Sequence, residues 1–568
     1  MKAFDIGLSA LRAQQLTLSV QGNNLANAST PGYHRQVATL ASRAPLRDDN
    51  FSIGSGVSVT DVQRLQSTAI ETSLLRNSSE AGYSQQTLGV AKQIESLLTP
   101  GDASIHASLS SFFNRLEKVA NSPQDQTVRK EFLTSATELM NGFNSLDQQL
   151  ASVGRDVSLS LNDGIKQVNQ QVKDIAAMNS EIFRARTLGI TPNELLDRRD
   201  QISSQLSRYM EVESRTLPNG QEETQLAGGR ISIGTVPVTF RVMQDSDGRT
   251  GVAVNNLPTA TTLNSGSLAA MTTALNETIP EFQSRLRDLA RGIVQAVDQQ
   301  HAQGISARGP ATVLIGNRGV KDVALPLARS NPAFPVSYGD LSVTVTDTVT
   351  GVRRTENITI NPDSDSLQDI AAKLSAVSGV TASIDVARNT LLITAQSGNA
   401  IDFAGRSDNP SDTSINSHPD ETGILAALGI NSLFEGSEPG TLKVRSEISE
   451  NPDQLATSMS GQPGDGRNMA AMASVRDVRF DALGGRTFTE EMADVTAESG
   501  LQVQTSDSQN TQLQAFRQRL ETDRDAVSGV DINEEMLQMM QTQRAYQAAA
   551  KLITTADQML TELFQLVR

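Results

Sequence analysis

The C-terminal end of the chain carries its most regular hydrophobic pattern. Its seam positions, most of them apolar, return at alternating steps of four and three residues, which is the pattern of a helix that packs against another helix. Asp531 precedes the pattern as the expected N-cap, and Glu534 occupies the capping-box position. We predict a helix of about 36 residues, ~54 Å long, that needs a partner. The seam positions are Ile532, Met536, Met539, Gln543, Tyr546, Ala550, Ile553, Asp557, Leu560, Phe564 and Val567.

The N-terminal end offers that partner as a second heptad pattern, which leaves parallel and antiparallel pairing equally open. The helix reaches Gly22-Asn23-Asn24, three poor helix formers, and Pro31-Gly32 then predicts a turn. The asparagines at 23, 24 and 27 have two interpretations: a frayed helix end, which the local pattern favours, or amides that cross-link packed helices. The heptad positions are Phe4, Leu8, Leu11, Gln15, Leu18, Gly22 and Leu25.

The middle of the chain alternates between helical and extended patterns. Residues 36–66 and 211–256 show the alternation of strands, whereas 67–210 and 268–303 show helical faces and 489–525 is predicted to form a long polar helix. Residues 311–445 read as strands, a short helix and a hairpin, which indicates a compact α+β insertion. His301, at the end of a predicted helix, is expected to be a surface group favoured by the helix dipole.

These patterns predict a mainly α fold with β-rich insertions. Terminal coiled-coil helices accompany an elongated helical-bundle domain and inserted β or α+β domains. We predict four domains: a terminal coiled-coil domain (1–66 with 525–568), a helical bundle (67–210 with 263–310 and 450–524), a small β domain (211–262) and an inserted α+β domain (311–449).

Composition excludes several classes of function. The net charge of −16 and the pI near 4.9 argue against nucleic acid as the main partner. The absence of cysteine removes disulfides, thiol nucleophiles and thiolate metal sites. Without a run of 18 apolar residues no membrane insertion is expected. The N-terminal residues lack the apolar run of a cleaved signal peptide, so any export is expected to use another route.

The motifs of enzymes are also missing. The 4 histidines form no HExxH pair, and no phosphate-binding loop or complete dinucleotide fingerprint is present. A calcium loop starting at Asp245 would need glutamate at position 256, where Asn256 stands. We therefore predict no enzyme activity, no cofactor and no metal site. An unrecognised carboxylate pair in the inserted domain remains the alternative.

The segment Ser19–Gln36, which includes NNLANASTPGY, resembles the N-terminal motif shared by bacterial flagellar rod, hook and hook-associated proteins. The C-terminal helix resembles the matching helix of that family. His34 departs from the basic residue that relatives often carry. The resemblance implies that the motif packs subunits together and that the C-terminal seam also binds a chaperone. The packing residues are Asn23, Asn24, Leu25, Ala26, Asn27, Thr30, Pro31, Gly32 and Tyr33, and the seam residues are Ile532, Met536, Met539, Tyr546, Ile553, Leu560 and Phe564.

Length and the middle of the chain favour the hook-associated members at the junction between hook and filament. That resemblance implies a secreted structural subunit of the extracellular flagellum, exported unfolded through the flagellar type III pathway without a cleaved signal peptide. Its termini would fold on assembly into a ring of about eleven subunits. The implied partners are the hook protein, a second junction protein, further copies of the chain and an export chaperone. The alternatives are a hook or distal-rod subunit and a secreted adhesin or binding module.

Overall fold

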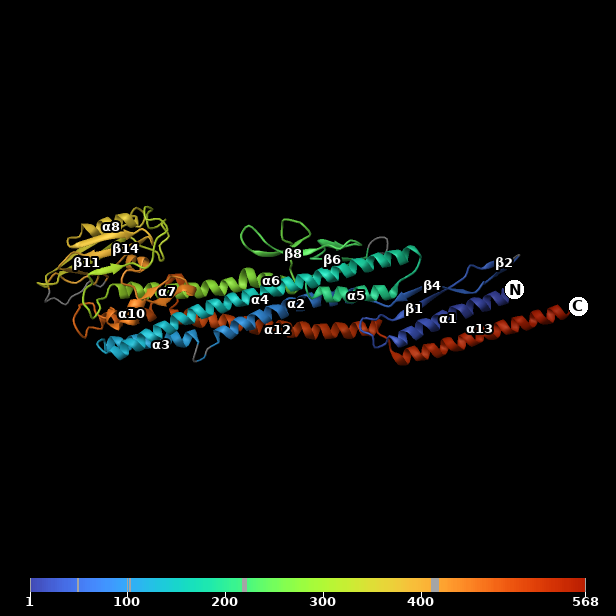
Figure 1. The fold of residues 1–568 in the computed structure, drawn as a ribbon. Coiled ribbons are helices and arrows are strands. Elements are labelled where there is room, and N and C mark those ends of the chain that lie inside the picture. The colour runs from blue at the N-terminus through green and yellow to red at the C-terminus, as the bar shows by residue number, and fades with distance from the viewer. Residues whose placement is uncertain are drawn as a thin grey trace. The chain divides into compact units, whose positions relative to one another are not determined.

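A computed structural model describes residues 2–48, 51–99, 101, 104–216, 222–409 and 418–566. The chain forms two compact units, of which unit 1 comprises residues 1–90, 156–276 and 504–568, and unit 2 comprises 91–155 and 277–503. The predicted fold class is confirmed, because long terminal helices accompany a helical body with several small inserted sheets (Figure 1). The finer division into four domains stays a prediction.

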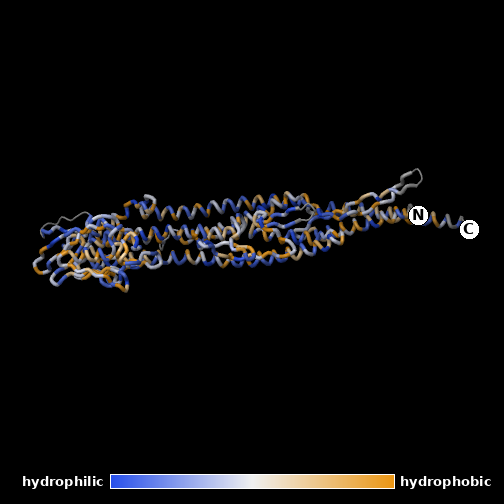
Figure 2. Tube along the Cα trace, turned by 90° about the horizontal axis from the view of Figure 1, so that it is seen from above, coloured by the Kyte–Doolittle hydropathy of each residue, from blue (hydrophilic) through white to orange (hydrophobic). Residues whose placement is uncertain are grey.

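The long helices follow the predicted hydrophobic faces. In Figure 2 hydrophobic positions recur between hydrophilic ones along the helical part of the chain. One feature was not predicted: a short π-helical turn, η1, interrupts the helix that was expected over 268–303. The long helices are α2 (Thr68–Leu98), α4 (Gln126–Thr187), α6 (Ser267–Thr273) followed by η1 (Ala274–Thr278) and α7 (Ile279–Ala302), and α12 (Phe488–Ser528).

Unit 1 pairs the two ends of the chain. Helix α1 (Lys2–Ala26) and helix α13 (Ile532–Leu566) lie side by side and antiparallel, so both termini lie at the same end of the pair (Figure 1). Gly7 lies against Ile553, where a β-carbon would come within 2.8 Å of Cγ1. Further along α1, Gln21 donates a hydrogen bond of 3.1 Å to Thr542. The pairing is therefore antiparallel, the choice that the sequence left open.

A β-hairpin lies along α1, as the alternation over 36–66 predicted. Strand β1 (Gln36–Ser42) pairs antiparallel with β4 (Val57–Arg64), with a bulge after Thr39. The start of β4 is fixed to the helix because the backbone N–H of Val57 donates to Ser9 Oγ at 3.2 Å. The hairpin is extended by β2 (Leu46–Asp48) and β3 (Phe51–Ile53).

The rest of unit 1 supplies the surface on which the hairpin rests. Helix α5 (Asn193–Ser207) begins directly after Pro192, which occupies its N-cap position. Two antiparallel sheets follow in the region expected to be β. They are formed by β5 (Val212–Thr216), β6 (Glu222–Leu226) and β7 (Ile231–Ile233), and by β8 (Phe240–Gln244) and β9 (Thr250–Val254).

Unit 2 contains α3 (Ile105–Asn121), short helices and the predicted α+β insertion. A buried apolar core fills the insertion, and α8 (Leu367–Ala376) begins with a capping box at Ser366. The stretch 407–419, whose many Ser, Asp, Asn and Pro residues predict a loop, falls largely on residues outside those described. The remaining elements include β10 (Val313–Ile315), β11 (Gly339–Asp347), β12 (Arg353–Ile360), β13 (Val380–Asp385), β14 (Thr390–Ala395), β15 (Asn399–Asp402), α9 (Ile424–Leu428), β16 (Phe434–Glu435), β17 (Lys443–Val444), α10 (Ser446–Glu450) and α11 (Arg467–Ser474).

The prediction that His301 is a surface group was wrong. Its side chain is completely buried, and both ring nitrogens are used: Nδ1 lies 2.8 Å from the carbonyl oxygen of Asn431, and Nε2 accepts from the backbone N–H of Ala456 at 3.1 Å. Burial lowers the pKa of His301 to about 4, with a further contribution from the charge of Arg445. His301 is therefore a neutral side chain that holds two distant loops to α7.

Candidate assembly site at the paired termini

A single side-chain amide, that of Asn24, connects α1, β1 and α13. Its Nδ2 donates to the carbonyl oxygen of Gln36 at 2.9 Å and to Glu535 Oε1 at 2.7 Å. Its Oδ1 accepts from the backbone N–H of Gln36 at 2.9 Å and from the hydroxyl of Tyr33 at 2.8 Å. Asn24 is only 1% exposed, and these four bonds use the whole capacity of an amide. The cross-linking interpretation therefore holds for Asn24, within one chain.

The other two asparagines behave differently. Asn27 Nδ2 donates to the Oδ1 of Asn23 at 2.6 Å and to its carbonyl oxygen at 3.0 Å, so the pair satisfies the end of α1 locally. Thr30 Oγ1 adds a bond of 3.2 Å to Asn27 Oδ1. The helix-end interpretation, which the local pattern favoured, therefore holds for Asn23 and Asn27.

Arg35 attaches the same segment to the start of α13. Its Nε donates to Glu535 Oε2 at 3.1 Å, and its Nη2 lies 3.3 Å from Glu534 Oε1 and 3.2 Å from Gln538 Oε1. Asp531 caps the helix, because its Oδ1 accepts from the backbone N–H groups of Asn533 and Glu534. Glu535 thus receives hydrogen bonds from Arg35 and Asn24, which explains why a carboxylate that is 1% exposed is stable there.

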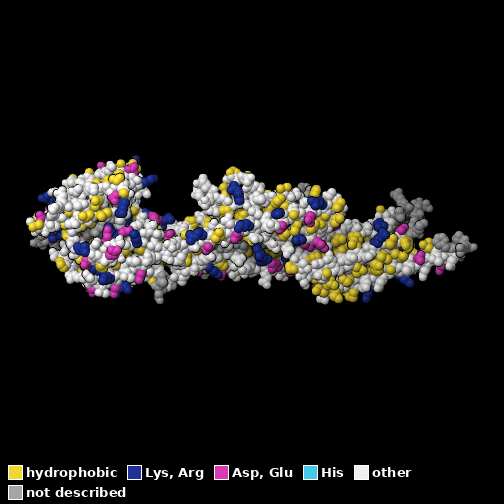
Figure 3. Space-filling model, in the orientation of Figure 1, with side chains coloured by type: hydrophobic (Ala, Val, Ile, Leu, Met, Phe, Trp, Pro, Cys, Tyr) yellow, Lys and Arg dark blue, Asp and Glu magenta, His cyan; other side chains and the backbone are white. Residues whose placement is uncertain are grey.

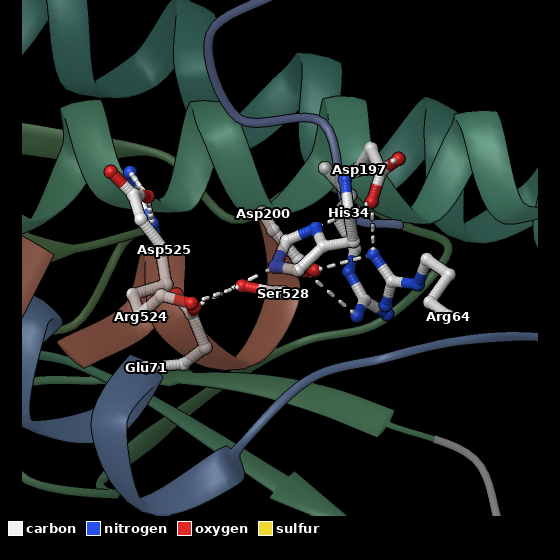
Figure 4. Close-up of polar contacts among 9 residues, drawn as sticks. His34, Arg64, Glu71, Asp197, Asp200, Arg524, Asp525 and Ser528 are labelled. Carbon is white, nitrogen blue, oxygen red and sulfur yellow. Dashed lines mark hydrogen bonds and ion pairs between the residues drawn. The ribbon is translucent and has the colours of Figure 1, made fainter. Parts of the chain in front are cut away.

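His34 attaches the segment to two further helices (Figure 4). Its Nδ1 lies 2.7 Å from Asp197 Oδ1 on α5, and its Nε2 lies 3.6 Å from Glu71 Oε1 on α2. Burial disfavours the charged imidazolium, but the hydrogen bond to Asp197 and the nearby carboxylate of Glu71 outweigh that cost and raise the pKa of His34 to about 9. His34 is therefore positively charged at neutral pH.

Arg64, the last residue of β4, completes the charged group (Figure 4). Its Nη1 donates to Asp197 Oδ1 at 2.7 Å and to Asp200 Oδ2 at 2.9 Å. Asn193 on the same helix donates to the carbonyl oxygen of Val62 at 2.8 Å. Helix α5 therefore presents two carboxylates and one amide to the hairpin.

Three consecutive residues thus connect three different helices. Tyr33 bonds to α1, His34 to α5 and Arg35 to α13, because successive residues of an extended segment point in different directions. Burial and the carboxylates of Asp197, Glu535 and Glu194 raise the pKa of Tyr33 to about 12, so its hydroxyl stays a donor. The remaining motif residues lie closer to solvent: Leu25 is half-buried, and Ala26, Thr30, Pro31 and Gly32 are exposed.

The side of α13 that packs on α1, which we call its inward row, differs from the predicted seam. Met539, Tyr546, Ile553 and Leu560 belong to the less exposed row as predicted, but the positions between them are shifted by one residue. Glu535, Thr542 and Ala549 are buried in place of the predicted Met536, Gln543 and Ala550. The reason is chemical, since Asn24 and Gln21 of α1 offer polar partners to Glu535 and Thr542. The side chain of Phe564 lies outside the described residues.

The shift leaves large apolar side chains on the outside of α13. Ile532 is 48% exposed, Met536 50%, Leu537 53% and Met540 51%. In Figure 3 hydrophobic side chains gather over the region of α1 and the start of α13. An exposed apolar area of this kind is typical of an interaction surface.

Other kinds of site find no support in the described residues. No group of three or more His, Cys, Asp or Glu side chains there is arranged to hold a metal ion. Within the same residues, no helix combines the length and the hydropathy that crossing a membrane requires.

Sequence reasoning missed most of the charged residues of this site. His34 and Arg35 follow the motif directly, but their partners Asp197 and Glu535 lie far away in the chain. Arg64 and Asp200 gave no signal, because a charged residue on a strand end or a helix face usually contacts solvent. The one available signal was the run of different polar types in Tyr33-His34-Arg35 directly before a strand.

Family models match three parts of the chain. Residues 91–313 match the model described as "Flagellar hook-associated protein FlgK helical domain". Residues 4–34 match "Flagella basal body rod protein", and residues 525–566 match "Flagellar basal body rod FlgEFG protein C-terminal". The two terminal matches cover nearly all of α1 with its motif and the whole of α13, the two helices that the site joins.

Whole-length relatives carry one name. The chain is 25% identical to flagellar hook-associated protein 1 of Salmonella typhimurium, over 98% of both chains, and 23% identical to that of Bacillus subtilis, over 98% of this chain and 96% of the relative. The flagellar hook junction protein FlgK from Burkholderia pseudomallei shares the fold, with a TM-score of 0.50 and 17% identity over 80% of this chain and all of that structure. These matches confirm the predicted resemblance: over nearly its whole length the chain is similar to flagellar hook-associated protein 1, and these relatives are structural flagellar proteins, not enzymes.

Proposed function

We propose that the chain is a subunit of the junction that joins the flagellar hook to the filament, and that it assembles through α1 and α13. The observation that carries this proposal is the two-sided character of α13. One side packs on α1 through Glu535 and Thr542, and the other leaves Ile532, Met536 and Met540 about half exposed. A helix with a second apolar side is expected to contact another subunit.

The motif after α1 divides into two roles. Its buried part, Asn24 with Tyr33, positions the terminal pair within the subunit. Its exposed part, Thr30, Pro31 and Gly32, is available to a neighbour. Subunit packing by this motif, as the family resemblance implied, is therefore proposed for the exposed part.

The finer features of the role follow from the same proposal. The hook protein lies on one side of the junction, a second junction protein on the other, and about eleven copies form the ring. The chain travels unfolded through the flagellar type III pathway without a cleaved signal peptide, and its termini order on assembly. Before export, a chaperone covers the seam of α13, because an uncovered apolar helix favours aggregation.

A pair of matched variants tests the assembly surface. In a strain that lacks its own copy, Met536→Asp with Met540→Asp places two charges on the outer side of α13. We expect the variant to be exported but filament subunits to be lost to the medium. Gln541→Asp with Gln547→Asp adds the same charge at exposed polar positions of the helix and should support normal filaments. Normal filaments with the methionine variant would rule out this surface as a subunit contact.

Antibody labelling separates this role from the alternatives. A junction subunit labels a short zone between hook and filament, whereas a hook or rod subunit labels the hook or lies below it. Label along the filament surface, or on material that is not attached to flagella, would favour a secreted adhesin.

A further inference from the structure

The connection between α4 and α5 presents an apolar and basic tip that the fold leaves uncovered. Leu188 is 76% exposed, Ile190 57% and Phe183 55%, and Arg184 beside them is exposed as well. We call these four residues the tip surface. Three large apolar side chains within eight residues are more than an isolated surface residue, and they suggest a contact.

The tip surface has a fixed shape. The backbone N–H of Ile190 donates to the carbonyl oxygen of Ala185 at 3.0 Å, and that of Gly189 donates to Arg186 at 2.9 Å. Gly189 adopts a φ of +76°. This is the Schellman ending of a helix, in which glycine takes the left-handed conformation. The exposed side chains are therefore held on an ordered turn, so that little conformational entropy is lost when they are covered.

The outer side of α13 has the complementary character. Its exposed apolar residues Ile532, Met536, Leu537 and Met540 accompany Glu534, whose side chain is 53% exposed although its Oε1 lies 3.3 Å from Arg35 Nη2. We call these five residues the outer face of α13. The tip surface combines apolar groups with a cation, and the outer face combines apolar groups with an anion, so that a contact buries both apolar areas and pairs the charges.

The two surfaces cannot meet within one chain. Both belong to unit 1, and Figure 1 shows the α4–α5 connection on one side of strands β1 and β4 and the start of α13 on the other. Two different surfaces on opposite sides of unit 1 are what a head-to-tail contact requires, and repeated head-to-tail contacts form a ring when the rotation between neighbouring copies closes.

We propose that the tip surface of one subunit packs on the outer face of α13 of the next copy of this chain. This inference rests on the proposed function, since it names the contact by which neighbouring subunits of the junction touch. Leu188 and Ile190 cover the apolar residues near Leu537, and Arg184 pairs with Glu534.

Disulfide cross-linking tests the contact directly, because the chain has no cysteine of its own. Leu188→Cys with Leu537→Cys is introduced in one chain, flagella are purified, and the proteins are oxidised and separated without reductant. We expect dimers and higher oligomers of this chain. Each single variant alone should stay monomeric, and the two single variants expressed together should give dimers but no longer products.

A matched control uses Val349→Cys, which is 88% exposed in unit 2, together with Leu537→Cys, and should give no oligomers. Charge variants provide a second measurement. Arg184→Glu should lower the cross-linking yield about two- to fivefold, the range of an exposed ion pair, whereas Arg184→Lys, which keeps the charge, should leave the yield unchanged. Only a monomeric product, or no product, in flagella with attached filaments would overturn the contact.

The same flagella distinguish this inference from the proposed function. If the cysteine variants attach filaments and label at the junction but do not cross-link, only the proposed contact is wrong. If the unmodified chain does not label at the junction, the proposed function itself is wrong.

Discussion

Asn24 and Glu535 are joined by a 2.7 Å hydrogen bond, although 511 positions of the chain separate them. The bond lies where the antiparallel terminal helices, the hairpin and the motif meet. Glu535 also accepts a hydrogen bond from Arg35. One carboxylate near the end of the chain therefore holds two residues near its beginning. The terminal pair is thus held by polar groups at one end and by apolar packing along the rest of its length.

Replacing Asn24 by alanine should destabilise the terminal pair. The change leaves both backbone groups of Gln36, the hydroxyl of Tyr33 and one oxygen of Glu535 without their partner, at about 1–3 kcal/mol for each group that stays buried. Hydrogen exchange at the start of α13 should become faster while exchange in unit 2 is unchanged. Asn27→Ala, which removes only local bonds, is the control, and equal effects of the two changes would contradict the role of Asn24.

The attachment of the hairpin to α5 should weaken at alkaline pH. The pKa of His34 is raised in the folded state to about 9 from 6.5, so its contribution is complete below pH 6.5 and is lost as the pH rises through 9. NMR titration of the imidazole should show this pKa, and hydrogen exchange at residues 33–36 should accelerate over the same range. In His34→Gln the exchange should lose this dependence on pH, and a pKa near 6.5 in the unchanged protein would contradict the charged cluster.

Unit 2 should respond to pH in the opposite direction. The pKa of buried His301 is lowered to about 4 from 6.5, so its contribution is complete above pH 6.5 and is lost as the pH falls from there toward 4. Hydrogen exchange at the end of α7 should accelerate in mild acid. His106, for which burial is partial, serves as the comparison: His106→Gln should leave this response in place, whereas His301→Gln should remove it.

In the free chain the terminal segments should open before the rest. The pair α1–α13 buries few large side chains, so its local opening needs little free energy. Limited proteolysis of the purified monomer is expected to remove residues 1 to about 60 and 525–568 and to leave a core near 70–520. Ends that resist protease as well as the core does would argue against folding on assembly.

Chaperone binding should depend on the inward row of α13. Tyr546→Asp with Ile553→Asp places charge where α13 packs on α1, the row that we propose a chaperone covers first. We expect loss of binding in a pull-down assay and unchanged thermal unfolding of unit 2. Retained binding would remove this row from the chaperone site.

The sequence predicted the helices and strands well because their hydrophobic periods are local. It placed α12 and α13 within a few residues, since Asp531 marks the start of α13 as its cap. It could not place the inward row of α13, because burial of Glu535 depends on Asn24 and Arg35 from the other end of the chain.

The two histidines show the same limit. A histidine at a helix end usually contacts water, and nothing near His301 in the sequence reveals the carbonyl of Asn431 or the amide of Ala456. Likewise His34 gave no sign of Asp197, which lies 163 positions away. Polar side chains at sites between elements are set by tertiary contacts, which a periodic pattern does not encode.

The antiparallel pairing of the ends has a consequence for chains that are cut short. A product that stops before α13 would retain Asn24, Arg35 and the hairpin, but the carboxylate that both residues need would be missing. Such a product could not form the hydrogen bonds that hold Asn24 and Arg35 in place. The N-terminal segment can therefore reach its folded arrangement only in a chain that includes α13.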